Sequence, residues 1–136
     1  MANTTFSGPV RSENGFEQVT KNTSTGAFTT NATYNATITG GVQALSGAGA
    51  ADLTNLITEL TTAAGAAAVT LADGSTSGQV KIINHIVDGG GTPTVTPTTF
   101  ANGTTIAFDA VGESVTLVWN STVGWVATSV NGATVA

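Results

Sequence analysis

Residues 71–129 read LADGSTSGQVKIINHIVDGGGTPTVTPTTFANGTTIAFDAVGESVTLVWNSTVGWVATS, a series of short apolar segments separated by turn-forming residues. Within the segments apolar residues tend to alternate with polar ones, and many are β-branched or aromatic, which is the pattern of β-strands. The strands recur at roughly ten-residue spacing with no helical pattern between them. This stretch therefore predicts an all-β fold, a compact antiparallel β-sandwich of the jelly-roll kind.

The alternation assigns side chains to the two faces of each predicted strand. Residues 79–88 are expected to place Val80 and Ile82 on one face and, after a one-residue slip, Ile83, His85 and Val87. The next strands have shorter patterns, with one face formed by Ile106 and Phe108 and another by Val115, Leu117 and Trp119. These faces are the expected core of the sandwich.

Turn signals divide the stretch. Asn102-Gly103 is a strong hairpin signal between Phe100 and Ile106, and Val123-Gly124 predicts a second hairpin joining Trp119 to Trp125. Pro93 and Pro97 bracket three residues, which predicts a short strand at the edge of a sheet. The last six residues, NGATVA, are expected to pack little.

The segment before this stretch is ambiguous. Residues 52–62 fit a helix capped by Asp52, yet they are rich in threonine and also fit a strand. We favour a strand over residues 56–62 that pairs with a strand near residues 67–71. Residues 42–51, VQALSGAGAA, are small and are expected to form a loop.

Residues 1–40 differ from the rest of the chain, because a few large apolar residues are spread among Thr, Asn, Ser and Gly. Such a segment cannot close a core of its own, and by composition it is either disordered or an extended arm. The recurring aromatic residues favour the arm. We therefore divide the chain into an N-terminal arm, residues 1–40, and a β-sandwich domain, residues 41–136.

Composition restricts the function. Charged residues make up 8% of the chain, against about a quarter in typical domains, and the formal net charge is −5 with three basic residues. This balance argues against nucleic acid binding, which needs clustered Lys and Arg. There is no cysteine, and we find neither a signal peptide nor a membrane-spanning run. A surface poor in charge suits a protein that is largely covered by partners, or one that works outside cells.

Candidate catalytic and metal-binding residues are few. His85 is the only histidine, and it lies within an apolar strand without a nucleophile motif, so we expect a core or interface position. Gly89–Gly91 lacks the Lys-Ser/Thr of a phosphate loop and is expected to be a flexible corner. The two tryptophans could stack on sugars but are more typical of core packing. Four acidic residues beside turns could bind a cation, although turn formation explains them as well: Asp73, Asp88, Asp109 and Glu113.

Most of the chain resembles small virion structural proteins of tailed bacteriophages, especially marine and cyanobacterial phages. The resemblance is carried by TFSGPVRSENGFE (residues 5–17), KNTSTGAFTTNATY (21–34), LADGSTSGQVKIINHIVDGGGTPTVTP (71–97), GTTIAFDAVGESVTLVW (103–119) and GWV (124–126). It implies a β-rich domain with an N-terminal arm that assembles as a trimer on a capsid or on a tail fibre. It implies no active site.

From the resemblance and the composition we expect a capsid decoration, or cement, protein that forms a homotrimer on the virion and bridges major capsid subunits. We expect no enzyme activity, no cofactor and no contact with nucleic acid or membrane. The capsid-binding arm would use Phe6, Pro9, Arg11, Phe16 and Phe28. The alternative is a tail or head fibre, or receptor-binding protein, that holds host glycans with an exposed Trp125 and with Asn and Thr side chains. A hydrolase is a third possibility, and it would need paired carboxylates in a cleft.

Overall fold

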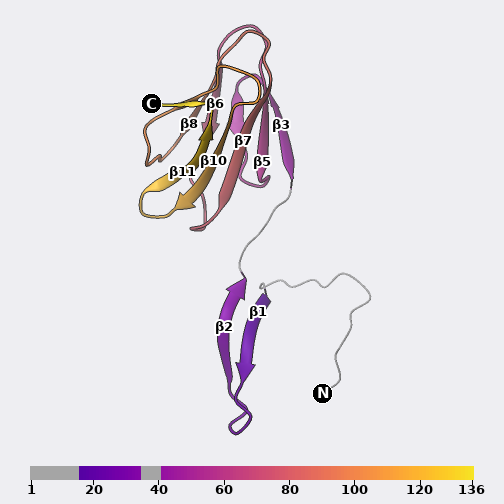
Figure 1. Ribbon diagram of the computed structural model, residues 1–136, viewed down its shortest axis with the longest axis vertical. Coiled ribbons are helices and arrows are strands. Elements are labelled where there is room, and N and C mark those ends of the chain that lie inside the picture. The colour runs from indigo at the N-terminus through magenta and orange to yellow at the C-terminus, as the bar shows by residue number, and fades with distance from the viewer. Residues whose placement is uncertain (1–15, 35–40) are drawn as a thin grey trace, which may run out of the picture. The chain divides into compact units, whose positions relative to one another are not determined.

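The structure is a computed structural model that describes residues 16–34 and 41–136. The chain divides into two units, Met1–Thr37 and Ile38–Ala136, and each is described by itself (Figure 1). Phe6, Pro9 and Arg11 of the expected arm lie outside the described residues.

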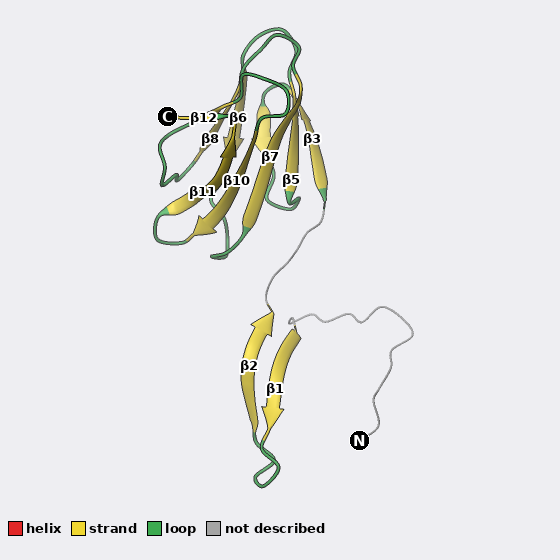
Figure 2. Cartoon of the chain, viewed as in Figure 1, coloured by secondary structure: helices red, strands yellow, loops and turns green. Residues whose placement is uncertain are grey.

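All regular elements among the described residues are β-strands (Figure 2). The first unit contains β1 (Phe16–Lys21) and β2 (Phe28–Tyr34). The second unit contains β3 (Val42–Ser46), β4 (Gly49–Ala51), β5 (Ile57–Thr61), β6 (Ala67–Leu71), β7 (Val80–Val87), β8 (Pro93–Pro97), β9 (Ile106–Ala107), β10 (Ser114–Asn120), β11 (Gly124–Asn131) and β12 (Thr134–Val135). The predicted all-β class is confirmed, and residues 57–61 form a strand and not a helix.

The second unit consists of two five-stranded sheets that enclose one core. The first sheet has the order β11-β10-β7-β5-β3, and Figure 1 shows these strands side by side. The second has the order β12-β9-β8-β6-β4. From β3 to β8 the chain crosses to the other sheet after every strand, so these strands form three successive turns of a two-sheet coil. The strands from β9 onward complete both sheets with antiparallel pairs.

The expectation of a wholly antiparallel sandwich was wrong for half of the pairs. Because the chain visits the other sheet between neighbours, β3, β5 and β7 run in the same direction and pair in parallel, as do β4, β6 and β8. For the same reason β5 does not pair with β6. The two strands lie in different sheets, and the pairing proposed between residues 56–62 and 67–71 was wrong.

Residues 42–51 form β3 and β4 instead of the expected loop. The small residues fit this position because the turn between the two strands is tight and Gly47 has a φ of 74°. A Cβ at Gly49 would lie 2.9 Å from Cδ1 of Leu45, so the leucine side chain packs directly over the backbone of β4 at this glycine. Low hydrophobicity here reflects an edge position, not irregular structure.

Three further expectations for the second sheet were wrong. The proline-bracketed strand β8 lies between β6 and β9 and not at an edge. The two prolines are the first and last residues of β8, and β9 pairs only with Thr94 and Val95, which lie between the prolines. The N–H groups that proline lacks are therefore not needed for the pairing of β8 with β9. Asn102-Gly103 does not form a hairpin: the Asn102 side chain instead accepts a hydrogen bond from the Ala127 N–H at 2.8 Å. The C-terminal residues form β12, and Val135 packs against the core.

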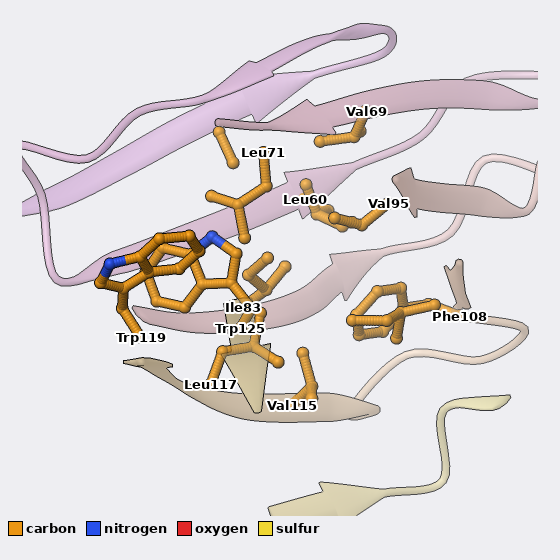
Figure 3. Close-up of a cluster of buried hydrophobic side chains, with 12 residues drawn as sticks. Leu60, Val69, Leu71, Ile83, Val95, Phe108, Val115, Leu117, Trp119 and Trp125 are labelled. Atoms are coloured by element: carbon orange, nitrogen blue, oxygen red, sulfur yellow. The ribbon is translucent and has the colours of Figure 1, made fainter. Parts of the chain in front are cut away.

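The core lies between the two sheets (Figure 3). The predicted faces are confirmed for Ile106 with Phe108 and for Val115, Leu117 and Trp119. On β7 the alternation runs from Val80 to His85 without the expected slip and turns Lys81, Ile83 and His85 inward. A register shift after His85 then leaves Val87, which was expected on the same face, exposed. Full burial of one aliphatic or aromatic side chain stabilises the folded state by roughly 1.5–3 kcal/mol. The core cluster consists of Ala51, Leu60, Val69, Leu71, Ile83, Val95, Ile106, Phe108, Val115, Leu117, Trp119 and Trp125.

The glycine-rich segment after β7 packs closely on the neighbouring turn of the coil. A Cβ at Gly91 would lie 1.7 Å from the Gly65 carbonyl oxygen, and one at Gly89 would lie 2.3 Å from the Thr62 carbonyl oxygen. These glycines therefore allow the β5–β6 and β7–β8 connections to stack on each other. This is a packing role, in place of the flexible corner expected from the sequence.

Candidate functional site

The hairpin of the first unit contains two of the expected arm residues. Phe16 begins β1 opposite Tyr34, and Phe28 begins β2 opposite Lys21. The connecting residues Asn22–Ala27 are all exposed. Their turn is closed by the Asn22 side chain, which accepts hydrogen bonds from the N–H groups of Ser24 and Thr25 at 2.9 and 3.0 Å. The arm residues in the described part of the chain thus belong to a two-stranded antiparallel ribbon.

His85 is fully buried, as expected for a core histidine. Its Nδ1 lies 3.1 Å from the Ala110 carbonyl oxygen and its Nε2 lies 3.0 Å from the Val87 carbonyl oxygen. The Thr62 hydroxyl lies 3.4 Å from Nε2. Because both ring nitrogens lie within hydrogen-bond distance of backbone carbonyl oxygens, the imidazole links β7 to the loop before β10.

The four acidic residues that were considered for a cation site do not converge. Asp88 accepts a hydrogen bond from the Gly90 N–H at 2.8 Å, and Asp73 accepts one from the Thr99 hydroxyl at 3.1 Å. Glu113 accepts one from the Asp109 N–H. In the described part of the chain no three His, Cys, Asp or Glu side chains gather into a metal-binding group. Each carboxylate that accepts one of these bonds supports a local turn or loop contact, as the sequence had suggested.

The two tryptophans lie inside the sandwich. Trp125 is fully buried and its indole N–H donates to the Ala72 carbonyl oxygen at 2.9 Å. Trp119 is 8% exposed and meets Trp125 edge to face (Figure 3). The alternative that placed an exposed Trp125 against a glycan was therefore wrong about this residue, because its ring has no free face for a sugar.

A polar cluster at one end of the core was missed by sequence reasoning. Lys81 is 1% exposed on the inner face of β7, and its Nζ donates to the Asn55 carbonyl oxygen at 2.8 Å. Asp52 accepts hydrogen bonds from the Thr54 and Asn55 N–H groups at 3.0 and 2.8 Å. Gln43 joins β3 to the same loop, since its Oε1 accepts from the Thr58 hydroxyl and from the Asp52 N–H. Strict alternation along β7 would have placed Lys81 inside.

Burial and charge act on this cluster in opposite directions. Burial lowers the pKa of Lys81 below its ordinary value, and the negative charge of Asp52 offsets part of that effect. Burial raises the pKa of Asp52, but the hydrogen bonds from Asn55, the charge of Lys81 and the bond from Thr54 together hold it below its ordinary value. The cluster ties the β4–β5 loop to the sandwich.

The charged side chains of the sandwich are almost all acidic. Residues 41–136 contain six carboxylates and a single lysine, so they account for the whole formal charge of −5. Because Lys81 is buried, every exposed charged side chain of this unit is acidic. An acidic surface repels the phosphate groups of nucleic acids.

Comparison with protein-family models and with curated proteins finds no match for this chain. Among residues 16–34 and 41–136, no helix has the length and hydropathy needed to cross a membrane.

Proposed function

We propose that the chain is a capsid decoration protein of a tailed bacteriophage, which binds the capsid surface as a homotrimer and stabilises the shell by bridging major capsid subunits. The work is mechanical and uses no cofactor. The N-terminal residues attach the protein to the capsid, and the sandwich forms the body of the trimer. The protein contacts neither nucleic acid nor membrane.

The observation that carries the proposal is the hairpin in a unit of its own. β1 and β2 form a two-stranded sheet, and such a sheet by itself is at best marginally stable in water because it needs a second layer on which to bury side chains. A partner surface supplies that layer, and extended segments commonly attach by adding strands to an exposed sheet edge. On this proposal the aromatic residues of the arm, among them Phe6, Phe16 and Phe28, anchor it on the capsid together with Pro9 and Arg11.

The surface chemistry of the sandwich supports the same proposal. A unit whose exposed charges are few and all acidic meets other proteins through uncharged faces. The fibre alternative needs an exposed aromatic ring on which a sugar can stack, and Trp125 does not provide one because it is buried. A fibre would also be present in few copies, whereas decoration at the local threefold positions of a shell needs hundreds.

Purified virions test the proposal. Quantitative mass spectrometry should find hundreds of copies per particle, and virions that lack the protein should lose integrity at lower temperature and at lower chelator concentration than wild type. Restoring the protein by adding it to the deficient particles should recover both properties. A copy number in the tens or below, or deficient particles as stable as wild type, would count against decoration.

A further inference from the structure

The first turn of the two-sheet coil is attached to the sandwich on one side only. It consists of β3 and β4, residues 42–51, and we call it the first coil turn. β3 is an edge strand of the first sheet, where Figure 1 shows it beside β5, and β4 is an edge strand of the second sheet. Each pairs with a single neighbour, β3 with β5 and β4 with β6. The first coil turn can therefore detach without breaking any strand pair in the rest of the sandwich.

The first coil turn contributes little to the core. No residue of β3 is buried, since its side chains alternate between exposed and half-buried positions. Ala51 is its one member of the core cluster, and Leu45 packs against that cluster from a partly buried position. The second coil turn, by contrast, supplies Leu60, Val69 and Leu71. A region with so few buried apolar contacts opens at a lower free energy than the core strands do.

One side chain joins the two edge strands at this end of the sandwich. Gln43 points inward from β3, because its register partner on β5 is the fully buried Thr58. Its Nε2 donates to the Ala50 carbonyl oxygen of β4 at 2.8 Å. Its Oε1 accepts from the Asp52 N–H at 2.9 Å and from the Thr58 hydroxyl at 2.8 Å. Since β3 and β4 belong to different sheets, the Gln43 amide connects the edge of one sheet to the edge of the other.

These three bonds make the closed position of the first coil turn depend on one amide. The Thr58 hydroxyl is buried, and Gln43 accepts the hydrogen bond that it donates. An apolar side chain at position 43 would leave this hydroxyl without that acceptor while the turn is closed. When the turn is open, water can bind the same group. Removing the amide therefore destabilises the closed state and not the open one.

We propose that the first coil turn opens as a unit while the rest of the sandwich stays folded, and that the Gln43 amide holds it closed. The first coil turn is also the first strand pair of the second unit, so it follows the N-terminal unit in the chain. Its residues, released as extended chain at roughly 3.3 Å each, span about 30 Å. Opening therefore lengthens the chain between the arm and the closed part of the sandwich. This use of the opening rests on the proposed function, whereas the opening itself does not.

Hydrogen–deuterium exchange of the full-length protein, followed by mass spectrometry of its peptides, tests the proposal. In the wild type the paired amides of β3 and β4 should exchange faster than those of β7 and β10, which lie inside the first sheet. Gln43→Leu should speed exchange in β3 and β4 by the same factor, roughly tenfold or more, and leave β7 and β10 unchanged. Ala44→Leu is the matched control, because it places the same side chain at the exposed neighbouring position, and it should exchange like the wild type.

Wild-type exchange of β3 and β4 at the rate of β7 and β10 would overturn the opening, because the sandwich would then unfold only as a whole. A folded Gln43→Leu that exchanges like the wild type, or that speeds all four strands equally, would overturn the role of Gln43. If Gln43→Leu does not fold, Gln43→Glu decides. It keeps the acceptor oxygen but places a second oxygen against the Ala50 carbonyl, so the same local acceleration is expected. These measurements use no virions, so a failure of the decoration test leaves them unaffected.

Discussion

Trp119 and Trp125 meet across the β10–β11 hairpin with their ring centroids 5.4 Å apart and their planes at 62°, an edge-to-face contact. The two residues are also register partners. The turn between them needs Gly124, which has a φ of 90° and would place a Cβ 2.5 Å from the Thr99 carbonyl oxygen. The pair thus closes one end of the core and fixes the hairpin to the segment before β9.

Trp125→Phe should lower the free energy of unfolding by about 1–3 kcal/mol, because it removes the hydrogen bond to the Ala72 carbonyl and leaves a cavity beside Trp119. Trp119→Phe, at a slightly exposed position, should cost less. Each variant keeps a single tryptophan, so fluorescence during urea denaturation measures both. Equal losses would show that the indole hydrogen bond contributes nothing.

Lys81→Met should change how stability depends on pH. The pKa of folded Lys81 is lowered by burial, against the charge of Asp52, from its ordinary value of 10.5. Between that lowered pKa and 10.5 the unfolded chain binds more protons than the folded chain, so the free energy of unfolding of the wild type increases as the pH rises. Below this pH range Lys81 is charged in both states, and the wild type bears the full cost of burying that charge. The difference between wild type and Lys81→Met, measured by urea denaturation from neutral pH upward, should therefore move in favour of wild type as the pH approaches 10.5. A constant difference would contradict the burial of a charged lysine.

Asp52→Asn should reveal a charge that stabilises the fold, in contrast to the buried charge of Lys81. The pKa of folded Asp52 lies below its ordinary value of 3.8, since the hydrogen bonds and the nearby lysine outweigh the effect of burial. Wild type should therefore be more stable than Asp52→Asn above 3.8, and it should lose this advantage as the pH falls through the lowered pKa. Asn keeps a side-chain oxygen for the Thr54 and Asn55 N–H groups but loses the oxygen that accepts from the Asn55 side-chain amide, so the comparison measures the charge together with that bond. Denaturation curves at several acidic pH values measure the difference.

Gly91→Ala should destabilise the sandwich by about 1–3 kcal/mol, as expected for an added methyl group in a closely packed contact. The new Cβ would meet the Gly65 backbone, which cannot rotate away as a side chain could. Ala64→Ser, in the opposing connection and exposed, is the matched control and should leave the unfolding midpoint nearly unchanged. A neutral Gly91→Ala would show that the two connections are free to separate.

The sequence was a good guide wherever local alternation decides the outcome. The buried faces around Ile106 and Leu117 and the hairpin at Gly124 follow from side-chain period and turn chemistry, which neighbouring residues determine. Strand partners were not predictable in this way, because alternation along β5 does not reveal that the chain crosses to the other sheet before β6. Lys81 was missed because a slip was assumed in β7.

Deleting residues 1–38 should leave the sandwich folded and sharply weaken binding to the particle. The core cluster and both five-stranded sheets lie within residues 42–136, so the sandwich does not need the arm for its own core. On the proposed function the arm supplies the attachment. Each Phe that it buries on the capsid is worth roughly 1.5–3 kcal/mol, partly offset by ordering the segment.

On the proposed function, a trimer would be held more tightly than a single chain, because three arms would have to release together before it left the shell. Full-length and truncated protein should therefore give similar circular dichroism of the sandwich and the same number of chains per assembly, while only the full-length protein rebinds capsids stripped of decoration. A truncated protein that rebinds as tightly as the intact one would move the attachment to the sandwich and leave the arm dispensable. A truncated protein that cannot fold would make the arm part of the core, and the division of the chain near Gly40 would then be wrong.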